Sequence, residues 1–243
     1  MKEMLVEVRN LTKVYLPGQI ALRNVDFSIR EGEVLCIAGL NGAGKTTALK
    51  ALLGLIRPTE GAIDFPRGKP RFGFLPEETE LPPELTGGEI VRFSKERAAT
   101  RGVKTERSPE EFLEMTKMKR AARLRVLEMS KGMRRRVALA AVLASDPTVL
   151  ILDEPQAGLD PLARLELGRL LRSRTSNGRS VLFASHDLTE VEEIGDRILI
   201  FHQGRIVDEI LQSDLERPGD LKRRFFERIG LPEEGKVPGE KTR

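Results

Sequence analysis

The chain begins with two segments in which apolar and polar residues alternate, residues 5–11 and 22–29. A period of two places every second side chain on the same face, so both segments are predicted to be half-buried β-strands. A similar pattern returns over residues 197–210 and is interrupted by Gln203 and Gly204. This interruption predicts a β-hairpin that turns at these two residues.

Three further segments are built around uninterrupted apolar runs, residues 33–39, 148–154 and 180–186. Strands that are buried on both faces of a parallel sheet have this character. Residues 71–78 contain a shorter strand pattern that leads into a loop. The chain is therefore predicted to contain a buried, mostly parallel sheet.

Helical patterns separate these strands, over residues 45–56 and 161–175. Strands that alternate with helices predict an α/β fold. Strand patterns are missing between residues 78 and 144, where helical patterns dominate and indicate an inserted helical subdomain. The predicted organisation is a core of residues 1–77 and 145–211, a helical subdomain of residues 78–144, and a charged C-terminal extension of residues 212–243 with a short helix near 221–229.

The charge balance and the single cysteine limit the possible partners and compartment. The 243 residues include 41 Lys and Arg against 37 Asp and Glu, so the formal net charge is +4. This excess is compatible with small polyanionic ligands and is too weak to favour nucleic acid as a partner. Cys36 lies in a buried-strand run, where we expect it to be a core residue. A lone cysteine excludes a disulfide framework and suits a reducing compartment such as the cytosol.

The apolar runs are too short for a membrane span. The longest, residues 137–144, falls far short of the ~20 residues that a spanning helix needs. The N-terminal residues also lack the apolar segment of a signal peptide. We therefore expect that the chain by itself does not cross a membrane.

A phosphate-binding loop is predicted between the first buried strand and the next helix. Residues 39–47 read GLNGAGKTT and match the pattern G-x-x-x-x-G-K-[ST]. Glycines let successive backbone N–H groups face one anion, and the helix N-terminus adds unpaired donors. Lys45 is expected to reach the β- and γ-phosphates, and Thr46 to bind Mg²⁺. A glycine-rich turn without a ligand is the alternative, and the strand–loop–helix context argues against it.

Acidic residues and a histidine end the other two buried strands. Asp153 and Glu154 lie where the ligands of parallel sheets bind. Asp153 is expected to hold Mg²⁺, and Glu154 to polarise a water for attack on the γ-phosphate. Because Pro155 follows, a simple helix cap is the alternative. His186 ends the next strand and is expected to contact the γ-phosphate, whereas His202 beside the hairpin turn is interpreted as structural.

The segment LEMSKGMRRRVALA, residues 127–140, is a helix start without a visible target. Ser130 and Gly132 stand where a helix N-terminus attracts an anion, although the chain already has a phosphate loop. An arginine run, residues 134–136, follows at once. We expect part of this run to anchor the helix within its own chain.

Together these motifs resemble those of the nucleotide-binding subunit of ATP-binding-cassette (ABC) transporters, over about residues 5–210. Residues 39–47 resemble the family's Walker A motif, residues 149–155 its Walker B motif, residues 157–160 its D-loop, and His186 its switch histidine. The resemblance implies a P-loop NTPase (RecA-like) core with an N-terminal antiparallel β subdomain and the inserted helical subdomain. It also implies that the core binds ATP and that the adenine ring stacks on Tyr15. The other residues expected to contact ATP are Gly39, Leu40, Asn41, Gly42, Ala43, Gly44, Lys45, Thr46 and Thr47.

The stretch that resembles the family signature departs from the usual LSGGQ. It reads Met129-Ser130-Lys131-Gly132-Met133. The serine and glycine that meet the γ-phosphate in the family are retained, and the variant resembles export-type cassettes. The resemblance therefore implies that residues 130–133, together with Asp160, contact the ATP held by a second subunit.

A second departure is Glu77, where most family members have a glutamine that touches Mg²⁺ or the attacking water. A carboxylate keeps the acceptor role and loses the amide donor. Export-type members often carry glutamate here, so the resemblance implies that Glu77 joins Thr46 and Asp153 at the metal. The spacing after Pro76 favours Glu77 over Glu78.

The resemblance implies an ATPase that uses ATP and Mg²⁺ and dimerises with a second ATP-binding subunit, another copy or a paralogue. Glu154 would activate water, and Lys45 and His186 would stabilise the developing charge. A separate membrane-spanning permease would carry the transported molecule, with export favoured, and the chain would lie in the cytoplasm on the inner face of the cell membrane. The helical insertion and residues 76–85 are the expected docking surface; a plain exposed loop is the alternative.

Two other functions remain open from the sequence. A soluble single-cassette ABC ATPase could act as an assembly or regulatory factor without transport. Long coiled-coil relatives that maintain chromosomes are disfavoured, because no sustained heptad pattern lies between Lys45 and Ser130. A small P-loop kinase is disfavoured because it would not need the signature, Asp160 and His186 together.

Overall fold

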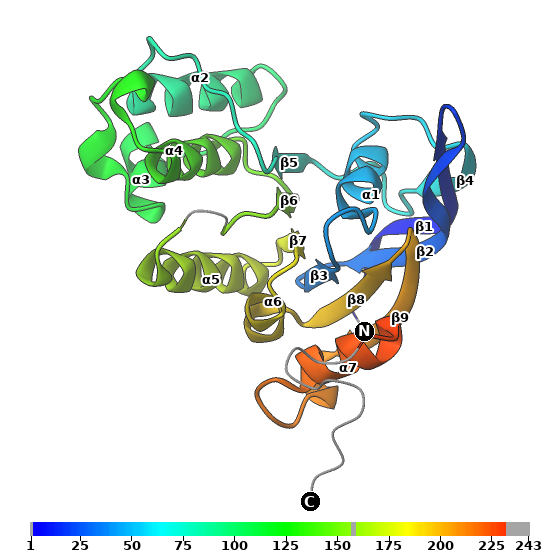
Figure 1. Ribbon diagram of the computed structural model, residues 1–243. Helices are drawn as coiled ribbons and strands as arrows, with labels where there is room; N and C mark the ends of the chain where they lie inside the picture. The colour runs from blue at the N-terminus through cyan, green and yellow to red at the C-terminus, as the bar shows by residue number, and fades with distance from the viewer. Residues whose placement is uncertain (1, 157–158, 232–243) are drawn as a thin grey trace, which may run out of the picture.

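The central sheet of the protein is mostly parallel, as predicted. A computed structural model describes residues 2–156 and 159–231 (Figure 1). Six strands run in the order β5-β6-β7-β3-β8-β9, and every neighbouring pair is parallel except β8 with β9. These strands are β3 (Val34–Ala38), β5 (Phe72–Leu75), β6 (Val149–Asp153), β7 (Ser180–Ser185), β8 (Arg197–His202) and β9 (Arg205–Leu211).

A separate antiparallel sheet forms the N-terminal subdomain. Its strands are β1 (Met4–Tyr15), β2 (Gln19–Arg30) and β4 (Glu60–Asp64), in the order β2-β1-β4. The sequence pattern predicts β1 and β2 and misses β4. None of the five residues of β4 is buried, and the strand pairs only with β1. Its position is therefore decided by its partner, because it carries no apolar pattern of its own.

Two apolar clusters cover the two faces of the central sheet. On one face, α1 (Lys45–Leu52) and the antiparallel sheet pack over alternate strand residues such as Leu35 and Ile37. On the other face lie α4 (Lys131–Ala144), α5 (Pro161–Ser176), α6 (Leu188–Ile194) and α7 (Asp220–Ile229), in one cluster with Val34 and Cys36. Cys36 is fully buried, as expected. The period-two alternation of β3 is what lets one strand serve both layers.

The inserted segment is helical, as predicted. It contains α2 (Gly87–Ala99), α3 (Pro109–Met115) and α4, and this helical lobe lies across β5 and β6 from α1 (Figure 1). Thr86 and Ser108 begin α2 and α3 with capping boxes, in which the cap side chain and a glutamate three residues later accept each other's backbone N–H groups. Buried residues of α4 belong to the same apolar cluster as those of β6. The helical lobe therefore shares part of its core with the central sheet.

The segment after β9 is part of the packed fold as far as residue 231. The helix predicted near 221–229 is α7, which packs on α6 and β9 through Leu221, Phe225 and Ile229. Residues 232–243 of the predicted extension lie outside the described residues. Within residues 2–156 and 159–231, no helix is long and apolar enough to cross a membrane. Three short 3₁₀ helices complete the elements, at Lys119–Ala121, Val126–Glu128 and Gln212–Asp214.

Candidate functional site

The loop between β3 and α1 packs closely against the backbone of two other segments, at Phe201 and at Ala21. A Cβ atom on Gly39 would lie 2.6 Å from the carbonyl oxygen of Phe201, and one on Gly44 would lie 2.6 Å from that of Ala21. Gly44 also has a φ of 106°, which glycine adopts without strain. Because glycine stands at the start of α1, no side chain caps this helix, and its first N–H groups are available to an anion.

A solvent-open hollow lies over this loop. It is also lined by Tyr15, Glu77 and Glu154, which come from three other parts of the chain. Of the residues predicted to contact ATP, residues 40–47 and Tyr15 all line the hollow. Gly39 does not; its carbonyl oxygen instead accepts a hydrogen bond of 2.7 Å from Lys45 Nζ. Tyr15 is 36% exposed, and Lys13 Nζ lies 5.0 Å from the centroid of its ring.

Two of the three residues predicted to bind Mg²⁺, Thr46 and Asp153, touch each other. Thr46 Oγ1 donates to Asp153 Oδ2 at 2.7 Å. Asp153 is 2% exposed, burial raises its pKa, and its Oδ1 has no hydrogen-bond partner among the described residues. A buried carboxylate oxygen without a donor, beside a hydroxyl, fits a hard divalent cation. No group of three or more His, Cys, Asp or Glu suited to a metal occurs in the described part of the chain.

Glu77 and Glu78 differ in their position relative to this hollow. Glu77 lines it, together with Thr46 and Glu154. Glu78 lines only a neighbouring groove between residues 77–83 and the helical lobe. The position of Glu77 is therefore consistent with the choice that the sequence favours.

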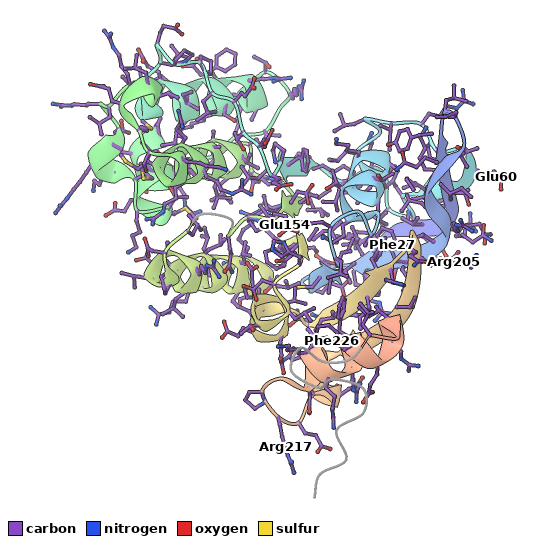
Figure 2. All side chains as sticks on the ribbon, in the orientation of Figure 1. Phe27, Glu60, Glu154, Arg205, Arg217 and Phe226 are labelled. Carbon is purple, nitrogen blue, oxygen red and sulfur yellow. The ribbon has the colours of Figure 1, made fainter. Side chains whose placement is uncertain are left out.

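The three residues predicted to act in catalysis meet at Glu154. Its Oε1 lies 3.2 Å from Lys45 Nζ, and its Oε2 lies 2.8 Å from His186 Nδ1. Lys45 and Glu154 are both buried, while the His186 side chain is 56% exposed. Glu154 has a φ of 48°, in the left-handed region that residues other than glycine rarely adopt. Figure 2 shows Glu154 near the middle of the molecule, between the helical lobe and the antiparallel sheet.

The signature residues do not reach the phosphate loop of their own chain. Ser130 is the N-cap of α4 and its Oγ accepts a hydrogen bond from Met133 N at 3.2 Å. Residues 130–133 and Asp160 line a different hollow, which shares no residue with the one over the phosphate loop. Asp160 is the N-cap of α5 and pairs with Arg136 at 3.6 Å. The rest of the predicted D-loop, residues 157–158, lies outside the described residues.

The arginine run confirms the expectation that part of it anchors the helix. Arg135 is 5% exposed and donates to the backbone of the core, including Pro155 O at 2.9 Å. Its burial is readable in part from the helical period, because Arg135 lies four residues before the buried Leu139. The sequence does not reveal which carbonyl groups it reaches.

Sequence reasoning missed a buried carboxyl group behind Glu154. Glu190, in α6, is 5% exposed and its Oε2 accepts a 2.7 Å hydrogen bond from Ser185 Oγ, which lies 3.5 Å from Glu154 Oε2. Burial raises the pKa of Glu190 to about 8, aided by the charges of Asp187 and Glu154 and opposed by that of Arg164. The available signal was the position of Glu190 beside Val191 and one turn before Ile194, on the buried face of the helix.

The raised pKa of Glu190 predicts how the stability of the protein changes with pH. The folded state holds its proton up to about pH 8, whereas the ordinary pKa of the group is 4.5. The contribution of Glu190 to the free energy of unfolding is therefore complete below about pH 4.5. It is lost as the pH rises towards 8, at a slope of at most about 1.4 kcal/mol per pH unit. Glu190→Gln should flatten this decline in urea unfolding curves. Glu193→Gln, an exposed residue of the same helix, is the control; equal slopes for the two variants would contradict the prediction.

Comparison with known proteins identifies related chains. A family model described as ABC transporter matches residues 22–157. The Nod factor export ATP-binding protein I of Burkholderia orbicola (strain AU 1054) is 36% identical over 216 residues, 84% of this chain and 70% of that one. The SkfA peptide export ATP-binding protein SkfE of Bacillus subtilis (strain 168) is 30% identical over 235 residues, 93% of this chain and 97% of that one.

Solved structures of similar chains agree with this result. An ATP-binding subunit of an ABC transporter has a TM-score of 0.80 and 28% identity, and the match covers 93% of this chain and 99% of that chain. A dimeric ATP-binding cassette in a post-hydrolysis state, bound to ADP and Pi, has a TM-score of 0.75 and 27% identity, covering 86% of this chain and 99% of that one.

Proposed function

This chain belongs to the ABC transporter family, and on that premise we propose how its residues divide the work. It is the ATP-binding and ATP-hydrolysing subunit of an export-type transporter. The observation that carries the assignment of roles is the convergence of Lys45 and His186 on Glu154, beside the Thr46–Asp153 pair. The phosphate loop, the candidate metal ligands Thr46 and Glu77, and Glu154, the proposed general base, all line one hollow.

The residues of one chain would act as follows. The loop 39–47 binds the phosphates through backbone N–H groups, and Tyr15 stacks on the adenine ring. Thr46, Asp153 and Glu77 hold Mg²⁺, which would neutralise charge on the β- and γ-phosphates. Glu154 takes the proton of the attacking water.

Lys45 and His186 support this step from the two sides of the carboxylate. Lys45, freed from Gly39 O, reaches the phosphates, where its charge stabilises the developing negative charge. His186 Nδ1 stays within hydrogen-bond reach of Glu154 and fixes one carboxylate oxygen. With one oxygen fixed, the other is free to face the water.

The site is completed by a second subunit. Ser130 and Gly132 lie away from their own phosphate loop, at the N-terminus of a 14-residue helix. A second ATP-binding subunit, another copy or a paralogue, would place these residues over the γ-phosphate of the first. Each chain then supplies half of two sites, and hydrolysis reopens the pair.

A membrane-spanning permease is the second proposed partner, which would hold the chain at the cytoplasmic face of the membrane. The groove between residues 77–83 and the helical lobe is a candidate docking surface. Three glutamates, residues 77, 78 and 80, line it, together with Lys131, Arg134 and Arg135. The glutamates favour a docking segment that carries basic residues.

The docking proposal is tested by charge reversal. The full chain is added to membrane vesicles of its own cells that have been washed free of peripheral proteins, and the bound fraction is measured. Glu78→Lys with Glu80→Lys is expected to lower binding about tenfold without changing the ATPase rate of the unbound chain. Glu60→Lys with Glu227→Lys, two exposed positions elsewhere, is the control. If the wild-type chain shows no saturable binding, the result contradicts the transport function and favours the soluble assembly-factor function.

A further inference from the structure

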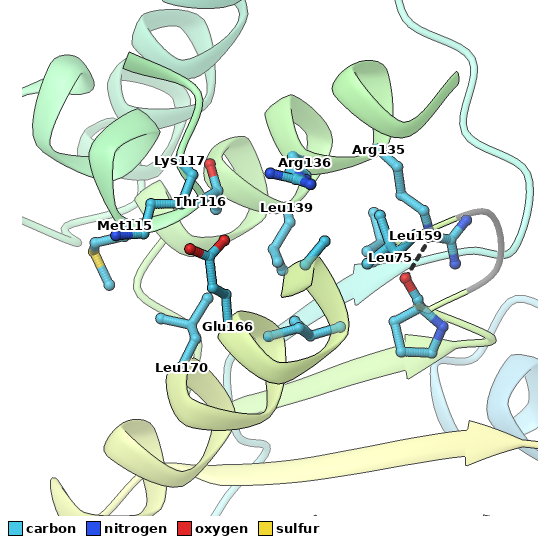
Figure 3. Close-up of a pocket in the computed structure, with 13 residues that line it drawn as sticks. Leu75, Met115, Thr116, Lys117, Arg135, Arg136, Leu139, Leu159, Glu166 and Leu170 are labelled. Carbon is cyan, nitrogen blue, oxygen red and sulfur yellow. Dashed lines mark hydrogen bonds between the residues drawn. The ribbon is translucent and has the colours of Figure 1, made fainter. Parts of the chain in front are cut away.

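Arg135 crosses from the helical lobe to the catalytic core. It leaves α4 just over one turn after Ser130, and its guanidinium lies at the end of an apolar hollow between α4 and α5 (Figure 3). Leu75, Leu139 and Leu159 line the same hollow. Polar side chains, among them Arg136 and Glu166, also line the hollow, but no hydrogen bond joins the Arg135 guanidinium to them among the described residues.

Those contacts are all backbone carbonyl groups of the site. Nε donates to Pro155 O at 2.9 Å, Nη2 donates to Asp153 O at 2.8 Å and to Glu154 O at 2.6 Å, and Nη1 donates to Glu77 O. The guanidinium has five N–H donors in a fixed plane, so four carbonyl groups fix its position and it fixes theirs. Burial lowers the pKa of Arg135, and the nearby charges of Glu77, Asp153 and Glu154 favour its charged form.

The contacts bear directly on the conformation of Glu154. The left-handed backbone of this residue is strained and persists only where surrounding contacts hold it. Arg135 Nη2 holds the carbonyl oxygens on both sides of that backbone, those of Asp153 and Glu154 itself. The direction in which the carboxylate leaves towards Lys45 and His186 follows from this backbone.

We propose that Arg135 is a positioning residue for Glu154: the signature helix of each chain, through Arg135, aims the catalytic carboxylate of that same chain. This rests on the proposed role of Glu154 as the group that activates water. Ser130 begins the same helix and, in the proposed function, faces the other subunit's ATP. Closure over one ATP would then be transmitted through α4 to the carboxylate of the second site. Glu77 is tied to the same guanidinium, so the candidate docking loop acts on the same point.

Another buried arginine provides a matched control. Arg174, in α5, is 9% exposed and donates through Nη2 to Pro147 O at 2.7 Å. Neither Arg174 nor Pro147 lines the hollow over the phosphate loop. Arg174→Ala therefore measures what the loss of a buried arginine does to stability alone.

The test compares Arg135→Ala, Arg135→Lys and Arg174→Ala in the full chain. For each variant, kcat and KM for MgATP and the urea unfolding midpoint are measured. The measurements are repeated with about 20 mM guanidinium chloride, and the same concentration of sodium chloride is the control. Misplacing a single catalytic group lowers the rate by up to about 100-fold. Arg135→Ala is expected to lower kcat at least about tenfold with KM changed less than about threefold, and guanidinium, entering beside the existing hollow, is expected to restore part of kcat. Arg135→Lys should be intermediate, and Arg174→Ala should lose stability while keeping kcat.

Several outcomes overturn the proposal. Arg135 is merely structural if folded Arg135→Ala keeps the wild-type kcat. It is also merely structural if Arg135→Ala and Arg174→Ala lose kcat and stability in parallel and guanidinium restores neither. If Arg135→Ala does not fold, wild-type kcat in Arg135→Lys overturns it equally, because lysine cannot reach four carbonyl groups. Wild-type turnover in Glu154→Gln would instead show that the proposed role of Glu154 is wrong. An inactive Glu154→Gln beside a fully active Arg135→Ala rejects the positioning role alone.

Discussion

Glu154→Gln is expected to lower ATP turnover by about 100-fold to 10,000-fold, the range that general base catalysis supplies. Glutamine has the shape of glutamate and can still accept from His186, which lies 2.8 Å from the carboxylate, but it cannot take a proton from water. ATP should still bind, so the ATP-bound dimer should accumulate. Turnover is measured by phosphate release, and dimerisation by gel filtration with saturating MgATP.

The same substitution also removes the buried charge partner of Lys45. Breaking a buried pair is destabilising, so the nucleotide-free variant should unfold at lower urea, and MgATP should restore the loss by supplying phosphate charge to Lys45. Glu60→Gln, an exposed position on β4, should behave as wild type in all three measurements. A Glu154→Gln variant that stays monomeric with saturating MgATP, even in the presence of its membrane partner, would contradict the dimer with shared sites.

Ser130→Arg is expected to leave ATP binding to the monomer intact and to suppress hydrolysis by at least about 100-fold, the loss typical for one transition-state donor. The serine lies away from the phosphate loop of its own chain, and a long cation at this point would obstruct the approach of the second subunit. Binding is measured by equilibrium titration with a fluorescent ATP analogue, and hydrolysis by phosphate release.

Ser130 is also a helix cap, and its loss alone costs about 1 kcal/mol. Ser108→Arg separates the two effects, because Ser108 caps α3 in the same way: both hydroxyl oxygens accept from the N–H three residues later at 3.2 Å. The control should lose similar stability and hydrolyse ATP normally. Loss of ATP binding in the Ser130→Arg monomer would mean that this serine serves the site of its own chain.

The sequence predicted those parts of the molecule that depend on local pattern. Buried strands such as β3 and β6 are continuous apolar runs, and the residues after them reach one edge of the sheet because parallel strands end together. For this reason the sequence alone was enough to predict that Lys45, Glu154 and His186 lie in one site. The phosphate loop was equally readable, because its glycines are required by contacts with the backbone behind it.

The features that the sequence missed depend on partners distant in the chain. The strand β4 has no buried residue and exists as a strand only through β1. Glu190 shares a helix face with the apolar Ile194, but only the packing of α6 shows that it lies behind Glu154. The helical period indicates in part that Arg135 is buried, but its four carbonyl partners lie 18, 19, 20 and 58 residues away.

The sequence by itself therefore determined the family, the α/β fold and the chemistry at the ends of the strands, because each depends on residue types at fixed local spacing. Only the tertiary structure decided which carboxyl groups are buried, which carbonyl groups Arg135 holds, and that Ser130 lines a hollow apart from its own phosphate loop. Long-range hydrogen bonds arise when distant segments pack together, and a local pattern indicates at most which face of a helix turns inward.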